Sequence, residues 1–124
     1  MNRKISADNI DYEIQELQKL KIKILDILQQ PSKTLHEEIL RKYIELQSVT
    51  EVADYFNQQE YCVEEQYYNG QVRERKFTSN DISHLIKMSK DKIEAEEDLI
   101  IFTKTLFNYK CKKASWRNLI KLAQ

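Results

Sequence analysis

The chain has 124 residues and carries 20 basic and 20 acidic side chains, so its formal net charge is zero. It contains one glycine and one proline. Sheets and phosphate-binding loops need glycine at special backbone positions, so this composition argues against both and favours a single, mainly helical domain. A neutral chain also lacks the overall attraction to nucleic acid of a strongly basic protein, although one local basic patch could still bind it.

The sequence offers no signal for a membrane, a metal or a cofactor. No apolar run approaches the roughly 18 residues of a membrane-spanning helix, and residues 1–13 lack the apolar core of a signal peptide. We therefore expect a cytoplasmic protein. Cys62 and Cys111 stand alone and make no metal-binding pattern with His36 and His84, so both thiols are expected to be buried or half-buried.

The first predicted helix covers residues 8–30 and ends at Pro31. Apolar side chains recur along it every three or four residues, which gives the helix one apolar face. This face comprises Ile10, Ile14, Leu17, Leu20 or Lys21, Ile24 and Leu28. Two interpretations stay open: the segment 1–33 packs against the rest of the chain, or residues 10–28 form the seam of a homodimer.

Two further helices follow, with a very short connection between them. The capping-box pattern Ser/Thr-x-x-Glu occurs at Thr34 and again at Ser48, which predicts helices over residues 34–46 and 48–58. Helices this close in the chain must turn sharply and pack on one another.

The segment 61–77 predicts a β-hairpin. Its centre is the dipeptide Asn69-Gly70, which holds the one glycine of the chain. Asn-Gly is the strongest short signal for a two-residue hairpin turn, because both turn positions favour positive φ. Three tyrosines of this segment are expected to pack within the hairpin, namely Tyr61, Tyr67 and Tyr68.

A further helix is predicted over residues 79–88. Thr78 and Asp81 form a third capping-box pattern at its start. Its buried side is expected to consist of Ile82, Leu85 and Ile86, and its outer side of Ser79, Asn80, Ser83, His84 and Lys87. The remaining chain predicts a long helix from about Lys90 to Tyr109 and a short basic amphipathic helix, whose Trp116 is expected to fill the core.

The predicted fold is mainly α with one β-hairpin. Its centre is a winged-helix or helix-turn-helix-like core over residues 34–90, flanked by N- and C-terminal helices within 1–33 and 91–124. In helix-turn-helix proteins the last helix lies in the major groove, where short polar side chains reach base edges and the first amides meet a phosphate. The residues we expect to bind DNA are Arg73, Arg75, Lys76, Thr78, Ser79, Asn80, Ser83, His84 and Lys87.

Two stretches, "SVTEVADYFNQQEY" and "RKFTSNDISHLIK", resemble the DNA-binding recombinase domain of large serine recombinases. The matching residues are Val52, Ala53, Phe56, Asn57, Lys76, Phe77, Thr78, Ile82, Leu85 and Ile86. The likeness covers about residues 40–88, and it departs from the family at Glu60, where the family usually has glycine, and in the acidic linker that follows. It implies a DNA-reading module, similar to small phage or mobile-element regulators, without the serine catalytic domain.

Charges within the predicted hairpin leave two alternatives. The first strand carries three glutamates, which repel phosphate, and the return strand carries three basic residues, which attract it. These residues are Glu60, Glu64 and Glu65, and Arg73, Arg75 and Lys76. Either the return strand contacts DNA, or the two strands neutralise one another across the hairpin.

The sequence therefore predicts a sequence-specific regulator of transcription that binds double-stranded DNA and is encoded by a phage or a mobile element. The alternative is a non-enzymatic protein-binding module, such as a phage-type inhibitor of a host (defence) protein. An enzyme is not expected, because the chain shows no glycine-rich phosphate loop and no Cys/His nucleophile pair, and its carboxylates fall on solvated helix faces.

Overall fold

A computed structural model describes residues 5–124, so residues 1–4 of the predicted N-terminal segment lie outside the described residues. The elements in chain order are α1 (Ala7–Gln29), α2 (Leu35–Leu46), α3 (Val49–Gln58), β1 (Val63–Gln66), β2 (Val72–Arg75), α4 (Ser79–Lys87), the 3-10 turn η1 (Lys90–Lys92), α5 (Glu97–Lys110) and α6 (Trp116–Leu122). The fold is mainly helical with one two-stranded antiparallel hairpin, as the sequence predicts. No helix between residues 5 and 124 combines the length and the apolar character needed to cross a membrane.

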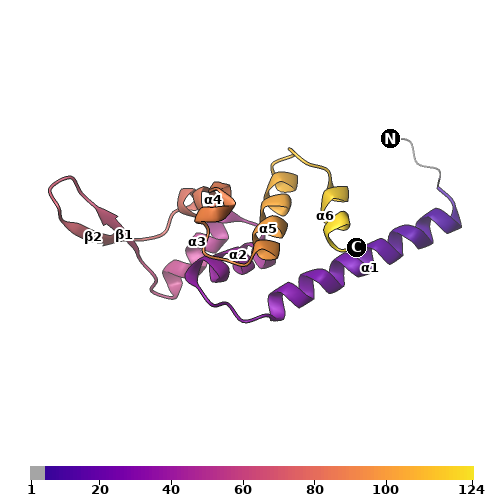
Figure 1. Ribbon diagram of the computed structural model, residues 1–124, viewed down its shortest axis with the longest axis horizontal. Helices are drawn as coiled ribbons and strands as arrows, with labels where there is room; N and C mark the ends of the chain where they lie inside the picture. The colour runs from indigo at the N-terminus through magenta and orange to yellow at the C-terminus, as the bar shows by residue number, and fades with distance from the viewer. Residues whose placement is uncertain (1–4) are drawn as a thin grey trace.

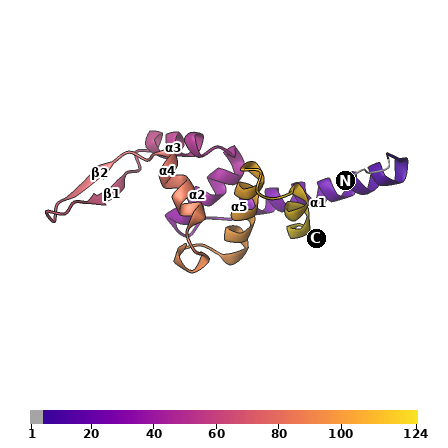
Figure 2. The same cartoon turned by 90° about the horizontal axis from the view of Figure 1, so that it is seen from above.

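The helices α2, α3, α4 and α5 form the centre of the molecule, and two parts project from it (Figures 1 and 2). The hairpin β1–β2 extends from one end, and the N-terminal half of α1 extends from the opposite end. α6 lies beside α1, and α5 packs against α2. The molecule is therefore elongated, with a packed centre between two projections.

The core follows the helical periodicity of the sequence. Its side chains are Ile39, Leu40, Tyr43 and Ile44 of α2, Val52, Ala53 and Phe56 of α3, Ile82, Leu85 and Ile86 of α4, and Leu99, Ile100, Phe102 and Leu106 of α5. Ile27 of α1 and Leu119 of α6 join the same core, so all three predicted segments contribute to it. Full burial of one such large side chain contributes on the order of 1.5–3 kcal/mol to folding.

The connection between α2 and α3 is as short as the sequence predicts. α2 ends at Gln47, whose φ of 55° lies in the left-handed region and turns the chain out of the helix. The next residue, Ser48, caps α3 by accepting a hydrogen bond from the amide of Glu51 at 3.3 Å. α2 packs on α3, and α3 packs on α4, which gives the predicted helix-turn-helix-like arrangement.

A buried ion pair within α2 is hydrogen-bonded to the end of α1. Arg41 Nη1 lies 3.5 Å from Glu37 Oε1, and both side chains are almost fully buried. Arg41 Nε also donates to the carbonyl of Ile27 at 2.9 Å, near the end of α1, where helix carbonyls lack intrahelical partners. Burial by itself would raise the pKa of Glu37, but hydrogen bonds from the amides of Lys33 and Glu96 and the charge of Arg41 hold that pKa below its usual value.

The predicted long helix over residues 90–109 is wrong at its start. The chain instead forms η1 and an irregular stretch before α5 begins. This stretch is tied to the start of α2, because the amide of Glu94 donates to His36 Nδ1 at 2.9 Å and the amide of Glu96 donates to Glu37 Oε2 at 3.0 Å. These amides find partners in another helix, so no intrahelical partner is needed and the helix starts later.

The hairpin lies where it is predicted, but its turn differs from the predicted type. Gly70 has a φ of 84°, whereas Asn69 is not among the residues with positive φ. The amide of Gly70 donates to the carbonyl of Tyr67 at 3.0 Å, and the amide of Tyr67 donates to the carbonyl of Gln71 at 2.9 Å. The connection is therefore a three-residue loop, in which the glycine takes the left-handed position that follows the turn.

Several side chains that the sequence predicts to pack within the hairpin or to be at least half-buried are exposed. They are Tyr61, Tyr67 and Tyr68, together with Cys62 and Cys111. The hairpin arm, defined here as residues 61–75, is a two-stranded ribbon with no second layer against which either face could be buried. Trp116 is likewise only half-buried, because Leu119 and Ile120 are the residues that α6 places in the interior.

Candidate nucleic-acid interface

The start of α4 is fixed by a capping box. Thr78 Oγ1 accepts from the amide of Asp81 at 3.4 Å, and Asp81 Oδ2 accepts from the amide of Thr78 at 2.8 Å. This exchange satisfies two amides at the helix start and places an acid at the positive end of the helix dipole. The capping box predicted at Thr34, the start of α2, is incomplete. Glu37 accepts a hydrogen bond from the amide of Lys33 rather than from that of Thr34.

The chain that leads into α4 is held by α3. Asn57 Nδ2 donates to the carbonyl of Phe77 at 3.0 Å, and Asn57 Oδ1 accepts from the amide of Phe77 at 2.7 Å. One side chain therefore satisfies both backbone groups of a residue whose own side chain is buried. The sequence analysis uses Asn57 only in the resemblance, because its partner lies 20 residues away and no short pattern marks the contact.

Arg75 joins the hairpin arm to α4. Its Nη1 and Nη2 each donate to a carboxylate oxygen of Asp81 at 2.7 Å, and its Nε lies 3.5 Å from Glu65 Oε2. A two-pronged guanidinium–carboxylate pair is strong and directional. The hydrogen bonds from Arg75 lower the pKa of Asp81 to about 2, and the same pair raises the pKa of Arg75 above its usual value. Arg75 therefore positions the arm, with two carboxylates balancing its charge.

The end of α4 is held by a lysine that the sequence gives no reason to single out. Lys104 of α5 donates from Nζ to the carbonyls of Ile86 and Met88. Carbonyls at a helix end have no intrahelical partner, so this ammonium group acts as a cap and also places a positive charge at the negative end of the dipole. Partial burial lowers the pKa of Lys104. Both ends of α4 are thus fixed by side chains.

α4 presents a short polar face to the outside. Asn80, His84 and Lys87 are exposed, and their spacing of four and three residues puts them on one side of the helix. Ser79 and Ser83 are half-buried, and the Ser83 hydroxyl donates to the carbonyl of Asn80 at 3.2 Å. The structure therefore brings three of the predicted base-reading side chains together on a surface that a partner can reach.

The predicted basic residues fall into two groups. Lys76 and Lys87 are exposed, one just before α4 and one at its end. Arg73 lies on the arm, opposite Glu65 in the strand register and with its guanidinium carbon 5.0 Å from the centre of the Tyr67 ring. Cross-strand balancing of charge, one of the two alternatives, therefore holds at Glu65, whereas Glu64 lies opposite Glu74, and the two lysines lie beside α4.

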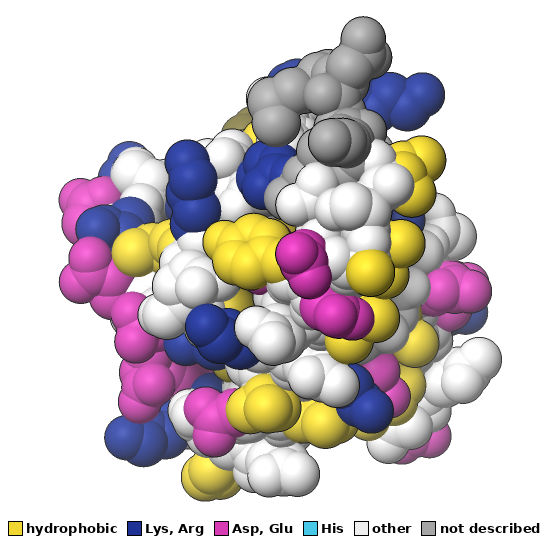
Figure 3. Space-filling view, turned by 90° about the vertical axis from the view of Figure 1, so that its right-hand side faces the viewer, with side chains coloured by type: hydrophobic (Ala, Val, Ile, Leu, Met, Phe, Trp, Pro, Cys, Tyr) yellow, Lys and Arg dark blue, Asp and Glu magenta, His cyan; other side chains and the backbone are white. Residues whose placement is uncertain are grey.

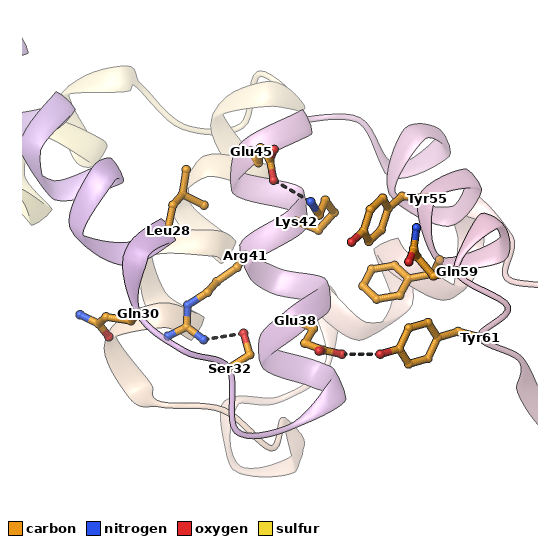
Figure 4. A pocket seen from close by; sticks show the side chains of 11 residues that line it. Leu28, Gln30, Ser32, Glu38, Arg41, Lys42, Glu45, Tyr55, Gln59 and Tyr61 are labelled. Carbon is orange, nitrogen blue, oxygen red and sulfur yellow. Dashed lines mark hydrogen bonds and ion pairs between the residues drawn. The ribbon is translucent and has the colours of Figure 1, made fainter.

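A groove of about 470 Å³ crosses the outer face of α2, between the end of α1 and α3 (Figure 4). Its polar side chains are paired with one another: Lys42 Nζ donates to Glu45 Oε2 at 2.8 Å, and the Tyr61 hydroxyl donates to Glu38 Oε2 at 3.2 Å. The bond to Glu38 raises the pKa of Tyr61. Since these groups already have partners within the chain, the groove is a weaker candidate than the outer face of α4.

Among the described residues, no group of three or more histidine, cysteine, aspartate or glutamate side chains is placed to hold a metal ion. Comparison of the chain with family models, with curated proteins and with solved structures gives no match. The resemblance to the DNA-binding recombinase domain stays a prediction that rests on the residues quoted for it.

Proposed function

We propose that the protein is a non-enzymatic, sequence-specific DNA-binding regulator that lays α4 in the major groove. The observation that carries this proposal is the setting of α4, which packs on α3 by its apolar side and turns its polar face outward. A helix fixed at both ends holds base-reading side chains in one geometry, which sequence-specific binding requires. Such a regulator acts in the cytoplasm, as the sequence analysis expects.

The side chains of the outer face have the chemistry that this role needs. Asn80 lies near the start of α4, and its amide can pair with N6 and N7 of adenine. His84, one turn further along, can donate a hydrogen bond to a base edge or a phosphate. Lys76 and Lys87 would contact phosphates on the two sides of the groove, while Arg73 would reach the backbone from the arm.

The proposal is tested by selecting a preferred duplex from a random pool and measuring affinity by fluorescence anisotropy at two salt concentrations. Asn80→Ala should weaken binding to the preferred duplex by roughly 1–3 kcal/mol and leave non-specific binding unchanged. Lys87→Ala should weaken binding to all sequences and flatten the salt dependence. Asn118→Ala makes the same change on the exposed surface of α6 and should have no effect. Failure of the wild-type protein to bind any duplex at low salt would refute the proposal.

A protein-binding module is the second candidate, and the tip of the hairpin arm favours it. Tyr68 is 104% exposed and Val72 is 58% exposed. Exposed tyrosine and apolar side chains are typical of protein interfaces, and each strand of the two-stranded sheet also has an unpaired edge. A host protein bound by this tip, for example one that the module inhibits, would be recognised without DNA.

The two candidates separate in one set of variants. If the arm binds a protein, a pull-down with the wild-type protein should recover a stoichiometric partner. Asn80→Ala should still recover this partner, whereas Tyr68→Ser should lose it. The opposite pattern, with DNA affinity lost in Asn80→Ala and kept in Tyr68→Ser, supports the DNA-binding regulator.

A further inference from the structure

The N-terminal half of α1 carries a large share of the exposed apolar surface. More than half of the exposed large hydrophobic side chains of residues 5–124 lie between Ile5 and Leu25. Ile10, Ile14 and Leu17 are 48%, 46% and 45% exposed. Figure 3 looks at the end of the molecule where α1 begins, and there hydrophobic side chains lie in a band between charged ones. Apolar surface concentrated in this way marks an interaction site.

The three exposed residues belong to a longer stripe. The positions 10, 14, 17, 21, 24 and 28 alternate in steps of four and three, which is the spacing of a coiled-coil seam. The second half of this stripe is used inside the chain, because Ile24 and Leu28 pack against the core. The first half of the stripe runs past the edge of the core, and within residues 5–124 its side chains stay about half exposed.

The neighbouring helix leaves the stripe open. α6 packs beside α1, where Arg117 Nη2 lies 3.9 Å from Glu13 Oε1. At 100° per residue, Glu13 lies 60° from Ile10 and 100° from Ile14 around the helix, so it lies on the flank of the stripe. A partner can therefore reach the stripe while α6 stays in place.

The charges along α1 select one kind of partner. The exposed acids Asp8 and Asp11 lie in the first half of the helix. The exposed lysines Lys19 and Lys21 lie in its second half, with one exposed acid, Asp26, near the helix end. Two copies of α1 placed side by side in parallel would set acids against acids and lysines against lysines. An antiparallel pair sets each acidic half against a basic half, which is favourable, so the pattern is complementary to itself about a two-fold axis.

One register satisfies both the apolar and the charged residues. When Ile14 of one copy packs on Leu17 of the other, Lys21 comes opposite Ile10 and next to Asp11 at both ends of the contact. The apolar residues then occupy the middle of the interface, and the ion pairs lie at its rim, as in stable protein interfaces.

We propose that the N-terminal half of α1 binds a second copy of this chain in antiparallel orientation. Ile10, Ile14 and Leu17 form the seam, and Asp11 of each copy pairs with Lys21 of the other. The two hairpin arms would then point away from each other at the far ends of the dimer, because the arm and the first half of α1 lie at opposite ends of one chain (Figures 1 and 2). This inference does not rest on DNA binding.

The first experiment measures association by sedimentation velocity over a range of concentrations, with the full chain and without DNA. The wild-type protein should form a dimer. Leu17→Asp should raise the dissociation constant at least about tenfold, because it buries a carboxylate in an apolar seam, with an unchanged circular dichroism spectrum. Ile22→Asp is the matched control: Ile22 is 66% exposed and lies outside the stripe, so the dimer should persist.

The second experiment tests the orientation by exchanging charges. Asp11→Lys and Lys21→Asp should each weaken the dimer, and the double variant should restore it, because the ion pair reforms in the opposite sense. Ile14→Asp repeats the seam test if Leu17→Asp loses its helical signal, because Ile14 lies opposite Leu17 in this register. A wild-type protein that stays monomeric at every concentration, or a dimer that both seam variants leave intact, overturns the proposal, and a double variant without rescue overturns its antiparallel orientation.

Discussion

α4 and the hairpin arm follow one another in the chain, yet they are stabilised in different ways. In α4, Ile82 is fully buried, its apolar neighbours are buried with it, and side chains from α3 and α5 hold the two ends of the segment. In the arm, both strands are almost entirely exposed, and the strands contact chiefly each other. The comparison shows that α4 is buried because other helices cover its apolar side, and that a strong local pattern alone does not bury the arm.

This difference divides the two candidate functions between the two regions. A fixed helix with an outward polar face suits the reading of a rigid duplex. An arm held by its own backbone hydrogen bonds and by Arg75 can open locally at low cost, so it can adapt to a partner surface.

The largest expected effect comes from truncating a buried side chain of α4, because the arm has no comparable packing. Ile82→Ala should lower the free energy of unfolding by about 2–4 kcal/mol, because Ile82 is fully buried and its truncation leaves a cavity. Val72→Ala removes a side chain that is 58% exposed and should cost less than about 0.5 kcal/mol. Urea unfolding followed by circular dichroism measures both values. Equal losses in the two variants would mean that the arm is packed in solution.

The second effect concerns the ion pair that links the two regions. The folded pKa of Asp81 is about 2, which is below the value of about 3.9 in an unfolded chain. The carboxylate therefore contributes stability that is complete at neutral pH and is lost as the pH falls through about 4 toward 2. For this partly exposed pair we expect a contribution of about 1–2 kcal/mol.

Asp81→Asn should remove that contribution at pH 7 and flatten the loss of stability in acid. The measurement is urea unfolding at pH 7 and at about pH 2.5, where Asp81 is largely protonated in the unfolded chain. Asp54→Asn changes an exposed aspartate of α3 and should keep the wild-type pH dependence. A variant that loses stability equally at both pH values would show that the pair with Arg75 does not depend on the charge of Asp81.

The parts of the fold that the sequence predicts are those with a local signal. The spacing of Ile82, Leu85 and Ile86 predicts the buried side of α4, and Gly70 marks the hairpin, because helical periodicity and turn chemistry act over a few residues. The late start of α5 is missed, since its cause is a pair of hydrogen bonds to the start of α2, near His36.

In the candidate site, too, local features can be predicted from the sequence and contacts between distant residues cannot. The outer position of Asn80, His84 and Lys87 follows from the helical repeat. The anchoring by Asn57 and Lys104 does not, because each bonds backbone groups 16 to 20 residues away, and no short motif records such a contact. Charge counting likewise assigns Arg75 to a phosphate, whereas its position beside Asp81 emerges only when the arm and α4 are placed together in space.

The smallest effect on overall stability is expected at the turn of the arm. Gly70 has a φ of 84°, and a Cβ added there meets no atom within 4 Å. Gly70→Ala therefore brings no clash but adds backbone strain of about 1–2 kcal/mol, which loosens the arm alone. The amide of Tyr67, bonded to the carbonyl of Gln71, should exchange with solvent about tenfold faster, while the urea unfolding curve stays that of the wild type.

Gly70→Asn is the matched control, since asparagine tolerates the left-handed region and should change the exchange less. Hydrogen exchange read by NMR at single residues distinguishes the two variants. If Gly70→Ala instead destabilised the whole chain by the full strain energy, the arm would unfold together with the core, and the contrast between a packed α4 and an independent arm would be wrong.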